Sequence, residues 1–214
     1  MLLVIETGFA ALSVALISGG ELLAEHHEIV GRGHVERLLP AVAALLADQA
    51  PPSAIVVDAG PGSYTGLRVG IAAARALGLA WGIDVTATTS TALLAAGVFA
   101  RRPDLRSVTA VLDAGRGQVY AQTITADWRG DEAPRAATPA AVAAGLPADA
   151  VLSGSGAKLV VTVRHFATVA GDYPRAADAR TLPEARRQGL PTPCYLEPAA
   201  YSQDLAEPSA PTVA

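Results

Sequence analysis

The first half of the chain alternates short apolar runs with longer amphipathic stretches. A β-rich run at 2–6, an alternating run at 12–17 and a third segment at about 21–29 are separated by glycine-containing turns, which predicts a three-stranded antiparallel meander. The next stretch, 34–50, has apolar residues at helical spacing and is followed by Pro51-Pro52, so we expect an amphipathic helix that ends there. These apolar positions are Val35, Leu38, Leu39, Val42, Leu45 and Leu46.

A second helix is predicted directly after a glycine-rich turn. The β-branched run 55–57 leads into the Gly-Pro-Gly turn 60–62, and either Ser63 or Thr65 can cap the helix predicted over 67–81. A glycine-rich turn before a helix N-terminus can bind an anion, and it is also an ordinary strand-to-helix connection. Both interpretations remain open, because the turn has neither the Lys-Ser or Lys-Thr pair of a Walker loop nor the spacing of the dinucleotide fingerprint.

The helix predicted over 67–81 is apolar on both faces. One face has large apolar side chains that can pack on a sheet, whereas the other is small and uncharged and includes Ala72, Ala73 and Ala76. In a domain of this size the sheet covers one face, so we expect the other to contact another helix or another protein. A strand at 84–88 and a helix at about 90–101 then complete a β-β-β-α-β-α-β-α unit.

Composition narrows the class of protein. The 214 residues are 51% hydrophobic and 17% charged, which supports one or two small folded domains. The N-terminal run has no basic region and the longest apolar tract is too short to span a bilayer, so we expect a cytoplasmic protein without membrane association. The single cysteine, Cys194, excludes an internal disulfide and a multi-cysteine metal site. The net charge of -4 gives no global attraction to nucleic acid, although Arg101, Arg102 and Arg106 form a local basic patch.

An internal repeat follows this basic patch. Residues 109–125 repeat the opening pattern of an apolar run, an acidic residue, a small turn and an alternating return strand. Asp113 takes the place that Glu6 has in the first copy. Two halves that each begin with a hairpin indicate a duplicated domain.

The second half is a degenerate copy of the first. It has a short helix near 139–144 and a strand with a glycine turn at 151–156, and its later part is rich in proline. We therefore expect an α/β protein with a first domain at 1–104 and a reduced second domain at 105–201. Residues 202–214 are expected to be a disordered tail.

A duplicated unit with an acidic residue at the end of each first strand is similar to the actin-like ATPase, sugar-kinase and Hsp70 superfamily of ribonuclease H-like domains. More closely, the chain resembles the TsaB (YeaZ-like) family of subunits in bacterial tRNA threonylcarbamoyladenosine biosynthesis. The resemblance spans nearly the full chain, and its most specific segment is 60–70, with the sequence GPGSYTGLRVG. The other segments that carry it are 5–7, 13–16, 34–40, 113–120 and 194–196.

The resemblance implies a non-catalytic partner subunit. In this family the helices after the meander and after the glycine turn pack against the equivalent helices of the catalytic paralogue TsaD, and an ATPase subunit, TsaE, joins the assembly. The complex transfers threonylcarbamoyl to the adenosine adjacent to the anticodon. The expected interface residues are His34, Arg37, Leu38, Ala41, Val69, Ala72, Ala73 and Ala76.

The same resemblance sets expectations for other partners and for cofactors. The isolated chain is expected to form a homodimer and to reach tRNA only indirectly, through the complex. It is expected to have no cofactor of its own, with ATP or ADP at the junction of the complex as a further expectation.

A cleft between the two halves, where the superfamily holds nucleotide phosphates and magnesium, is a second candidate site. Its expected residues are Glu6, Thr7, Gly60, Gly62, Ser63 and Asp113. The two carboxylates can equally cap turns, and Ser63 has no neighbouring base in sequence for nucleophilic catalysis. We predict no catalytic residue. We also predict no metal site, because no two histidines lie four residues apart, the pair with which the metal site of the catalytic paralogue begins.

Other functions fit parts of the sequence. A small ATP-dependent phosphotransferase of the same superfamily would use Glu6 or Asp113 as metal-linked acids and the glycine turns as phosphate cradles. A homodimeric scaffold without an enzymatic partner would use the same helices for self-association. The glycoprotease label attached to relatives of the family requires a metal or a nucleophile, and the sequence indicates neither.

Overall fold

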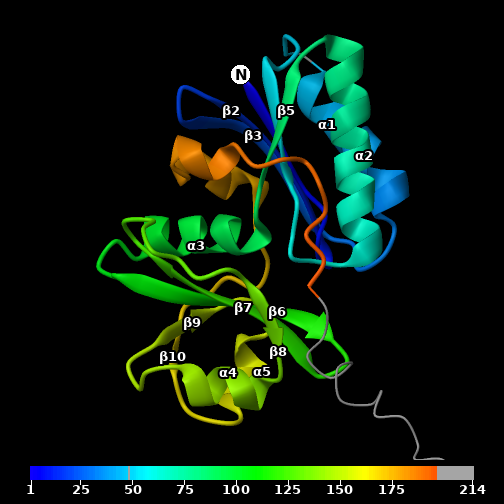
Figure 1. Cartoon of the computed structure of the whole chain (residues 1–214). Helices are drawn as coiled ribbons and strands as arrows, with labels where there is room; N and C mark the ends of the chain where they lie inside the picture. Colours follow the sequence, from blue (N-terminus) through cyan, green and yellow to red (C-terminus); the bar gives the residue numbers. More distant parts are fainter. Residues whose placement is uncertain (48, 197–214) are drawn as a thin grey trace, which may run out of the picture.

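The computed structural model describes residues 1–47 and 49–196, which form two lobes, each built on a five-stranded sheet (Figure 1). The first sheet, of order β3-β2-β1-β4-β5, contains β1 (Leu2–Glu6), β2 (Ala11–Ser18), β3 (Glu21–Ile29), β4 (Ala54–Asp58) and β5 (Asp84–Thr88). The second, of order β10-β9-β6-β7-β8, contains β6 (Ser107–Gly115), β7 (Gln118–Thr125), β8 (Arg135–Ala137), β9 (Val151–Ser153) and β10 (Ala167–Thr168). The tail predicted at 202–214 lies outside the described residues.

Both sheets have the same topology. In the first, β1 is antiparallel to β2 and parallel to β4, and in the second, β6 is antiparallel to β7 and parallel to β9. Counted from the antiparallel edge, the strands of each lobe therefore follow the order 3-2-1-4-5. The predicted duplication is confirmed, and so is the reduction of the second copy, whose last three strands have three, three and two residues.

The helices that cover the first sheet begin and end close to their predicted positions. On one face of this sheet lie α1 (His34–Leu46) and α2 (Tyr64–Trp81), whereas the second sheet carries the shorter α4 (Pro139–Gly145) and α5 (Ala157–Val161). The first helix ends before the predicted residue 50. The second begins at Tyr64 because Ser63 is its cap, with Ser63 Oγ accepting a hydrogen bond from Gly66 N at 3.0 Å. In the described part of the chain, no helix has the length and apolar character needed to cross a bilayer.

The third helix, α3 (Ser90–Arg101), lies between the two sheets (Figure 1). All of its residues from 90 to 98 are buried. Leu93 belongs to the core of the first lobe, whereas Leu94 and Val98 pack against the second sheet. The predicted division between residues 104 and 105 thus falls just after a helix that both lobes share.

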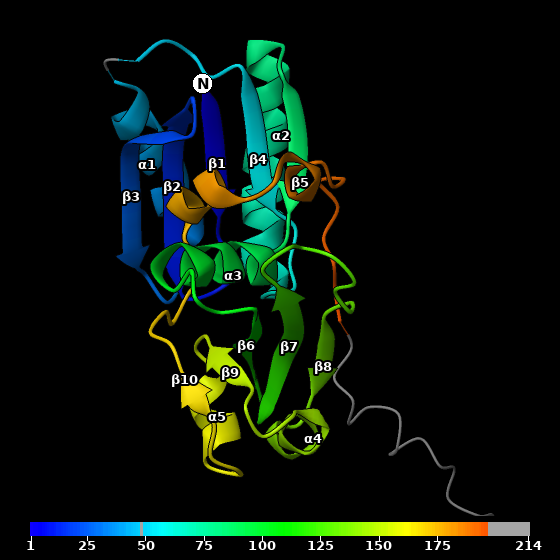
Figure 2. The ribbon, with the colours of Figure 1, turned by 90° about the vertical axis from the view of Figure 1, so that its left-hand side faces the viewer.

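The C-terminal segment returns to the first lobe, which the sequence did not predict. Two short 3-10 helices, η1 (Ala176–Thr181) and η2 (Glu184–Arg187), follow β10, and Ala176 N donates a hydrogen bond to Ser13 Oγ in β2 at 2.9 Å. Residues 189–196 then run beside β5 and α2 (Figure 2). This segment, placed in the second domain by the predicted division, packs on the first lobe.

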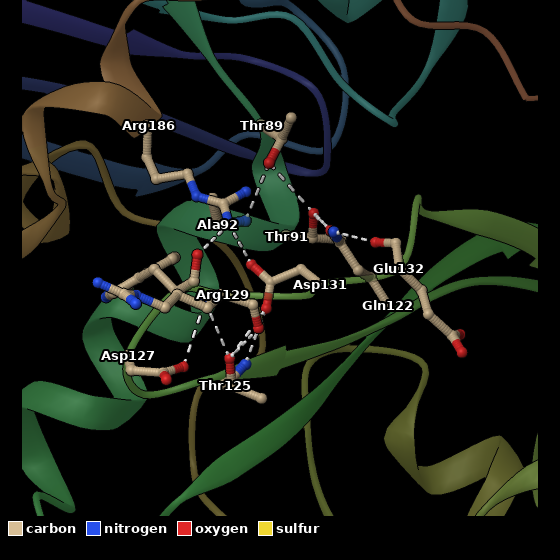
Figure 3. Close-up of polar contacts among 11 residues, drawn as sticks. Thr89, Thr91, Ala92, Gln122, Thr125, Asp127, Arg129, Asp131, Glu132 and Arg186 are labelled. Atoms are coloured by element: carbon tan, nitrogen blue, oxygen red, sulfur yellow. Dashed lines mark hydrogen bonds and ion pairs between the residues drawn. The ribbon is translucent and has the colours of Figure 1, made fainter.

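Polar contacts between α3, β7, the loop after β7 and η2 hold the lobes together (Figure 3). Arg186 Nη2 donates to Asp131 Oδ2 at 2.5 Å and to the Trp128 carbonyl oxygen at 2.6 Å. Thr91 Oγ1 in α3 donates to Gln122 Oε1 in β7 at 2.5 Å. The segment that returns to the first lobe is therefore also bound to the second.

Candidate functional site

A pocket of about 860 Å³ lies between the two lobes. The β1–β2 and β3–α1 loops, the N-terminus of α2, the β6–β7 hairpin and the turn after β9 form its lining. Of the six predicted cleft residues, Ser63 and Asp113 line the pocket, whereas Glu6, Thr7, Gly60 and Gly62 lie outside its lining. The structure thus brings together one residue from each half of the repeat.

The two strand-end acids, Glu6 and Asp113, have equivalent local roles. Glu6 Oε1 accepts a hydrogen bond from Gly8 N at 2.7 Å, and Asp113 Oδ1 accepts one from Gly115 N at 2.8 Å. Each carboxylate therefore caps the turn that follows its strand, as one of the two interpretations expects. Their surroundings differ, because Glu6 is fully buried whereas Asp113 is exposed and lines the pocket.

The glycines of the turn 60–62 are explained by close contacts between backbones. A Cβ atom on Gly62 would lie 2.8 Å from the Gly8 carbonyl oxygen, and one on Gly60 would lie 2.8 Å from the Cys194 carbonyl oxygen. Ser63 N also donates a hydrogen bond to the Gly8 carbonyl oxygen at 2.7 Å. These contacts give both glycines a structural reason that requires no bound phosphate.

Two buried carboxyl groups lie beneath the pocket. Asp58, at the end of β4, is 1% exposed and accepts hydrogen bonds from Ser90 Oγ at 2.7 Å and from Gly60 N at 2.9 Å. Burial raises the pKa of Asp58 to about 6. Burial, followed by repulsion from Asp58, raises the pKa of Glu6 well above its ordinary value. The pair therefore favours a protonated carboxyl group in the interior.

Sequence reasoning missed most of the aromatic lining of the pocket. Phe9, Tyr64, Tyr120 and Tyr173 come from four separate segments, and only the fold brings them together. Ser155 also lines the pocket, and its Oγ accepts a hydrogen bond from Asp113 N at 3.0 Å. The repeat could have indicated Ser155, because its glycine turn follows β9 as the turn 60–62 follows β4.

Three of the four histidines lie in the first lobe. His34 is buried, and its Nε2 lies 3.1 Å from the Ala11 carbonyl oxygen. His26 and His27 lie on β3, an edge strand of the first sheet. Within residues 1–47 and 49–196, no group of three or more His, Cys, Asp or Glu side chains is arranged to hold a metal ion.

Part of the outer surface of α1 and α2 is a patch of apolar residues, most of them exposed. We call it the α1/α2 face, and it consists of the exposed residues Val35, Leu39, Ala72, Ala76 and Leu79 together with the half-buried Val69. Val35 is 63% exposed and Leu79 is 86% exposed, which is unusual for large apolar side chains. The three glycines of α2 instead face inward, where Gly66, Gly70 and Gly78 allow the helix to approach the sheet closely.

The predicted interface residues divide into three groups. Arg37, Ala72 and Ala76 are exposed, Val69 and Ala73 are half-buried, and His34, Leu38 and Ala41 are buried. The buried group anchors α1 on the first lobe. The exposed apolar residues Val35, Leu39 and Leu79 lie on the same outer surface, although they are absent from the predicted set, because the sequence does not set which way each helix is turned about its axis.

Fold and site together define the class of protein. Two ribonuclease H-like lobes with the same strand order, facing one another across a pocket and sharing one helix, are the architecture of the actin-like superfamily. The family model described as TsaD, tRNA N6-adenosine threonylcarbamoyltransferase, matches residues 26–156, which is more than half of the chain.

Individual relatives narrow this class. The solved structure of YeaZ from Pseudomonas aeruginosa is similar, with a TM-score of 0.77 and 31% identity over 91% of this chain and 99% of that chain. The chain belongs to the TsaB/YeaZ family. The tRNA threonylcarbamoyladenosine biosynthesis protein TsaB of Bacillus subtilis is 37% identical over 123 residues, and that of Escherichia coli is 33% identical over 139 residues. These alignments cover 56% and 61% of this chain but only 52% and 59% of the two relatives, so the chain spans little more than half their length.

Proposed function

We propose that the chain is a non-catalytic subunit required for threonylcarbamoyladenosine formation in tRNA. It acts with a TsaD-like catalytic paralogue and a TsaE-like ATPase, and it reaches tRNA through this complex. The observation that carries the proposal is the exposed, uncharged α1/α2 face. The names of the curated relatives support the pathway.

The α1/α2 face suits the packing of helix against helix. Ala72 and Ala76 are small enough for a second helix to approach α2 closely, and Val35 and Leu39 provide apolar area on α1. The family model that includes both helices is that of the catalytic subunit, so a TsaD-like paralogue would offer a similar pair of helices. A second copy of the chain would use the same face with two-fold symmetry, and the two assemblies would compete.

The arrangement of polar groups supports a role without catalysis by this chain. Ser63 caps α2, and the Glu6 and Asp58 carboxyl groups are buried outside the pocket lining. ATP or ADP at the junction of the complex belongs to the same proposal, because Val35 and Val69 belong both to the α1/α2 face and to the pocket lining. Labelled ADP that bound the complex no better than the isolated chain would argue against this location.

Reconstitution tests the proposed function. The TsaD-like and TsaE-like subunits are combined with tRNA, ATP, threonine, bicarbonate and the adenylate synthase, with or without this chain, and modified adenosine is quantified by mass spectrometry. We expect product only when the chain is present. The variant Ala76→Glu places a carboxylate on the α1/α2 face and should weaken association with the TsaD-like subunit by about 2–4 kcal/mol.

A matched variant controls for the added charge. Ala140→Glu adds the same side chain at an exposed alanine of α4, on the second lobe, and should support full product formation. Equal product without the chain would reject the proposed function. Magnesium-dependent ATP hydrolysis by the isolated chain would instead favour a small phosphotransferase, and normal activity of folded Ala76→Glu would place the interface elsewhere.

A further inference from the structure

The last described residues form an extended segment that is bound along α2. We call residues 189–196 the C-terminal strap. Gly189 pairs with Ala87 of β5 through two backbone hydrogen bonds, of 2.8 and 2.9 Å, and Cys194 N donates to the Ala59 carbonyl oxygen at 2.7 Å. In Figure 2, α2 lies between α1 on one side and the strap on the other. The strap therefore borders α2 on the side away from α1.

The strap binds both charged side chains of α2. Arg75 Nη2 donates to the Pro191 carbonyl oxygen at 2.9 Å, and Arg68 Nε donates to the Tyr195 hydroxyl oxygen at 2.8 Å. The Arg68 guanidinium also lies 3.8 Å from the centroid of the Tyr64 ring, and Tyr64 stacks on Tyr195 with 5.0 Å between ring centroids. A hydrogen bond thus directs each guanidinium group toward the strap, and for Arg68 a cation–π contact with the Tyr195 ring, 5.8 Å from the ring centroid, adds to it.

These two arginines are next to the apolar residues of the α1/α2 face. Each residue turns the helix by about 100°, so Ala72 follows Arg68 at ~40° around the axis, and Leu79 follows Arg75 at the same angle. An arginine that was not held by the strap could extend over these neighbours, because its side chain has four rotatable bonds. A partner that packs on the face would then have to remove water from the charge without pairing it, which is unfavourable.

We propose that the C-terminal strap is part of the partner-binding surface, where it holds Arg68 and Arg75 away from the α1/α2 face and adds exposed apolar area at its border. Leu190 is 81% exposed and Tyr195 is 42% exposed, so both can contact a protein that covers α2. The occupant is the TsaD-like paralogue, whose helices would meet an uncharged strip. This inference rests on the proposed function.

A rescue experiment tests the role of the strap. Tyr195→Ala removes the hydroxyl oxygen that accepts a hydrogen bond from Arg68 and the ring that stacks on Tyr64. We expect the dissociation constant for the purified TsaD-like paralogue to rise about tenfold. Arg68→Met has a side chain of similar length without the charge and should bind as the wild type does. The double variant Tyr195→Ala/Arg68→Met should recover to within about threefold of the wild type, a rescue that a general loss of packing would not show.

The cysteine in the strap provides a second measurement. Cys194 is the single cysteine of the chain and is half-buried, and burial raises the pKa of its thiol, which slows its reaction with thiol reagents. Saturation with the paralogue should slow labelling of Cys194 further, because the partner holds the strap in place. Tyr195→Ala should speed labelling in the free chain, with circular dichroism confirming that it is folded.

Four results would overturn the inference. Two concern affinity for the paralogue: folded Tyr195→Ala binds as tightly as the wild type, or the double variant binds as weakly as Tyr195→Ala alone. Two concern the rate at which Cys194 is labelled: the rate is the same in free Tyr195→Ala as in the free wild type, or it is the same in the saturated complex as in the free chain. Ala76→Glu separates this failure from failure of the proposed function. If Ala76→Glu no longer binds the paralogue while Tyr195→Ala binds it normally, only the proposed role of the strap is wrong. If both variants bind normally, the α1/α2 face is also rejected as the binding site for the paralogue.

Discussion

Asp58 and Glu6 are buried carboxyl groups at the ends of neighbouring parallel strands, and their protonation links stability to pH. The pKa of native Asp58 is about 6, above the value of about 3.9 for an unfolded aspartate. The native protein therefore binds more protons than the unfolded chain between these values. The free energy of unfolding is expected to fall as the pH rises from about 4 through 6, by about 3 kcal/mol from Asp58.

Asp58→Asn isolates this contribution. Urea denaturation at pH 4.5, 6.0 and 7.5 should show that the wild type loses stability relative to Asp58→Asn as the pH rises. Asparagine has one side-chain oxygen where aspartate has two, so the variant loses an acceptor for either the Gly60 amide or the Ser90 hydroxyl. This loss changes the free energy of unfolding by the same amount at every pH. A stability difference that stayed the same at all three pH values would contradict the raised pKa of Asp58.

The N-terminal turn of α2 is held against the first lobe by contacts that exclude a side chain. A Cβ on Gly66 would lie 2.1 Å from the Thr7 carbonyl oxygen, and Thr7 Oγ1 donates to the Gly66 carbonyl oxygen at 2.8 Å. Gly66→Ala should therefore lower the free energy of unfolding by about 2 kcal/mol, although alanine favours an isolated helix by about 1 kcal/mol. Urea denaturation measures the change.

Gly145→Ala is the matched control for this substitution. Gly145 ends α4, and a Cβ there would approach no described atom more closely than Arg135 Nη2 at 3.5 Å, an ordinary contact. This variant should be close to neutral. If Gly66→Ala were as stable as Gly145→Ala, the close approach of α2 to the β1–β2 loop would not be required.

We expect the relative position of the two lobes to depend on a partly buried ion pair. The Asp131 side chain is 2% exposed and pairs with Arg186 of η2, which also binds the Trp128 carbonyl oxygen. Arg186→Met would leave both acceptors without this donor, and because the Asp131 carboxylate is buried we expect the free energy of unfolding to fall by about 2 kcal/mol. Hydrogen exchange should increase at 126–134 and 184–187, while the α1/α2 face stays unchanged.

Arg106→Met controls for the loss of a positive charge, since Arg106 is exposed at the start of the second lobe. It should alter neither stability nor exchange by a measurable amount. Faster exchange throughout Arg186→Met would mean that the pair stabilises the whole chain rather than the contact between lobes. Unchanged exchange at 126–134 would show that this ion pair does not hold the lobes together.

Much of the fold could be predicted because its determinants are local. The apolar spacing of α1 and α2, the turn residues between β1, β2 and β3, and Ser63 as a cap all act between residues close in sequence. The repeat of Glu6 by Asp113 indicated the duplication for the same reason, since each acid caps its own turn. Such interactions form whatever the rest of the chain does, so they can be read from the pattern.

Contacts between distant segments could not be read in this way. Tyr195 lies 127 positions from the Arg68 that it binds, and Arg186 lies 55 positions from Asp131. The pocket likewise combines loops from both lobes, and the exposed side of α2 depends on which residues the sheet buries. A sequence pattern specifies how each segment folds, whereas burial and pairing between segments arise only when the lobes pack. The strap, the ion pair between the lobes and the orientation of the α1/α2 face therefore come from the tertiary structure.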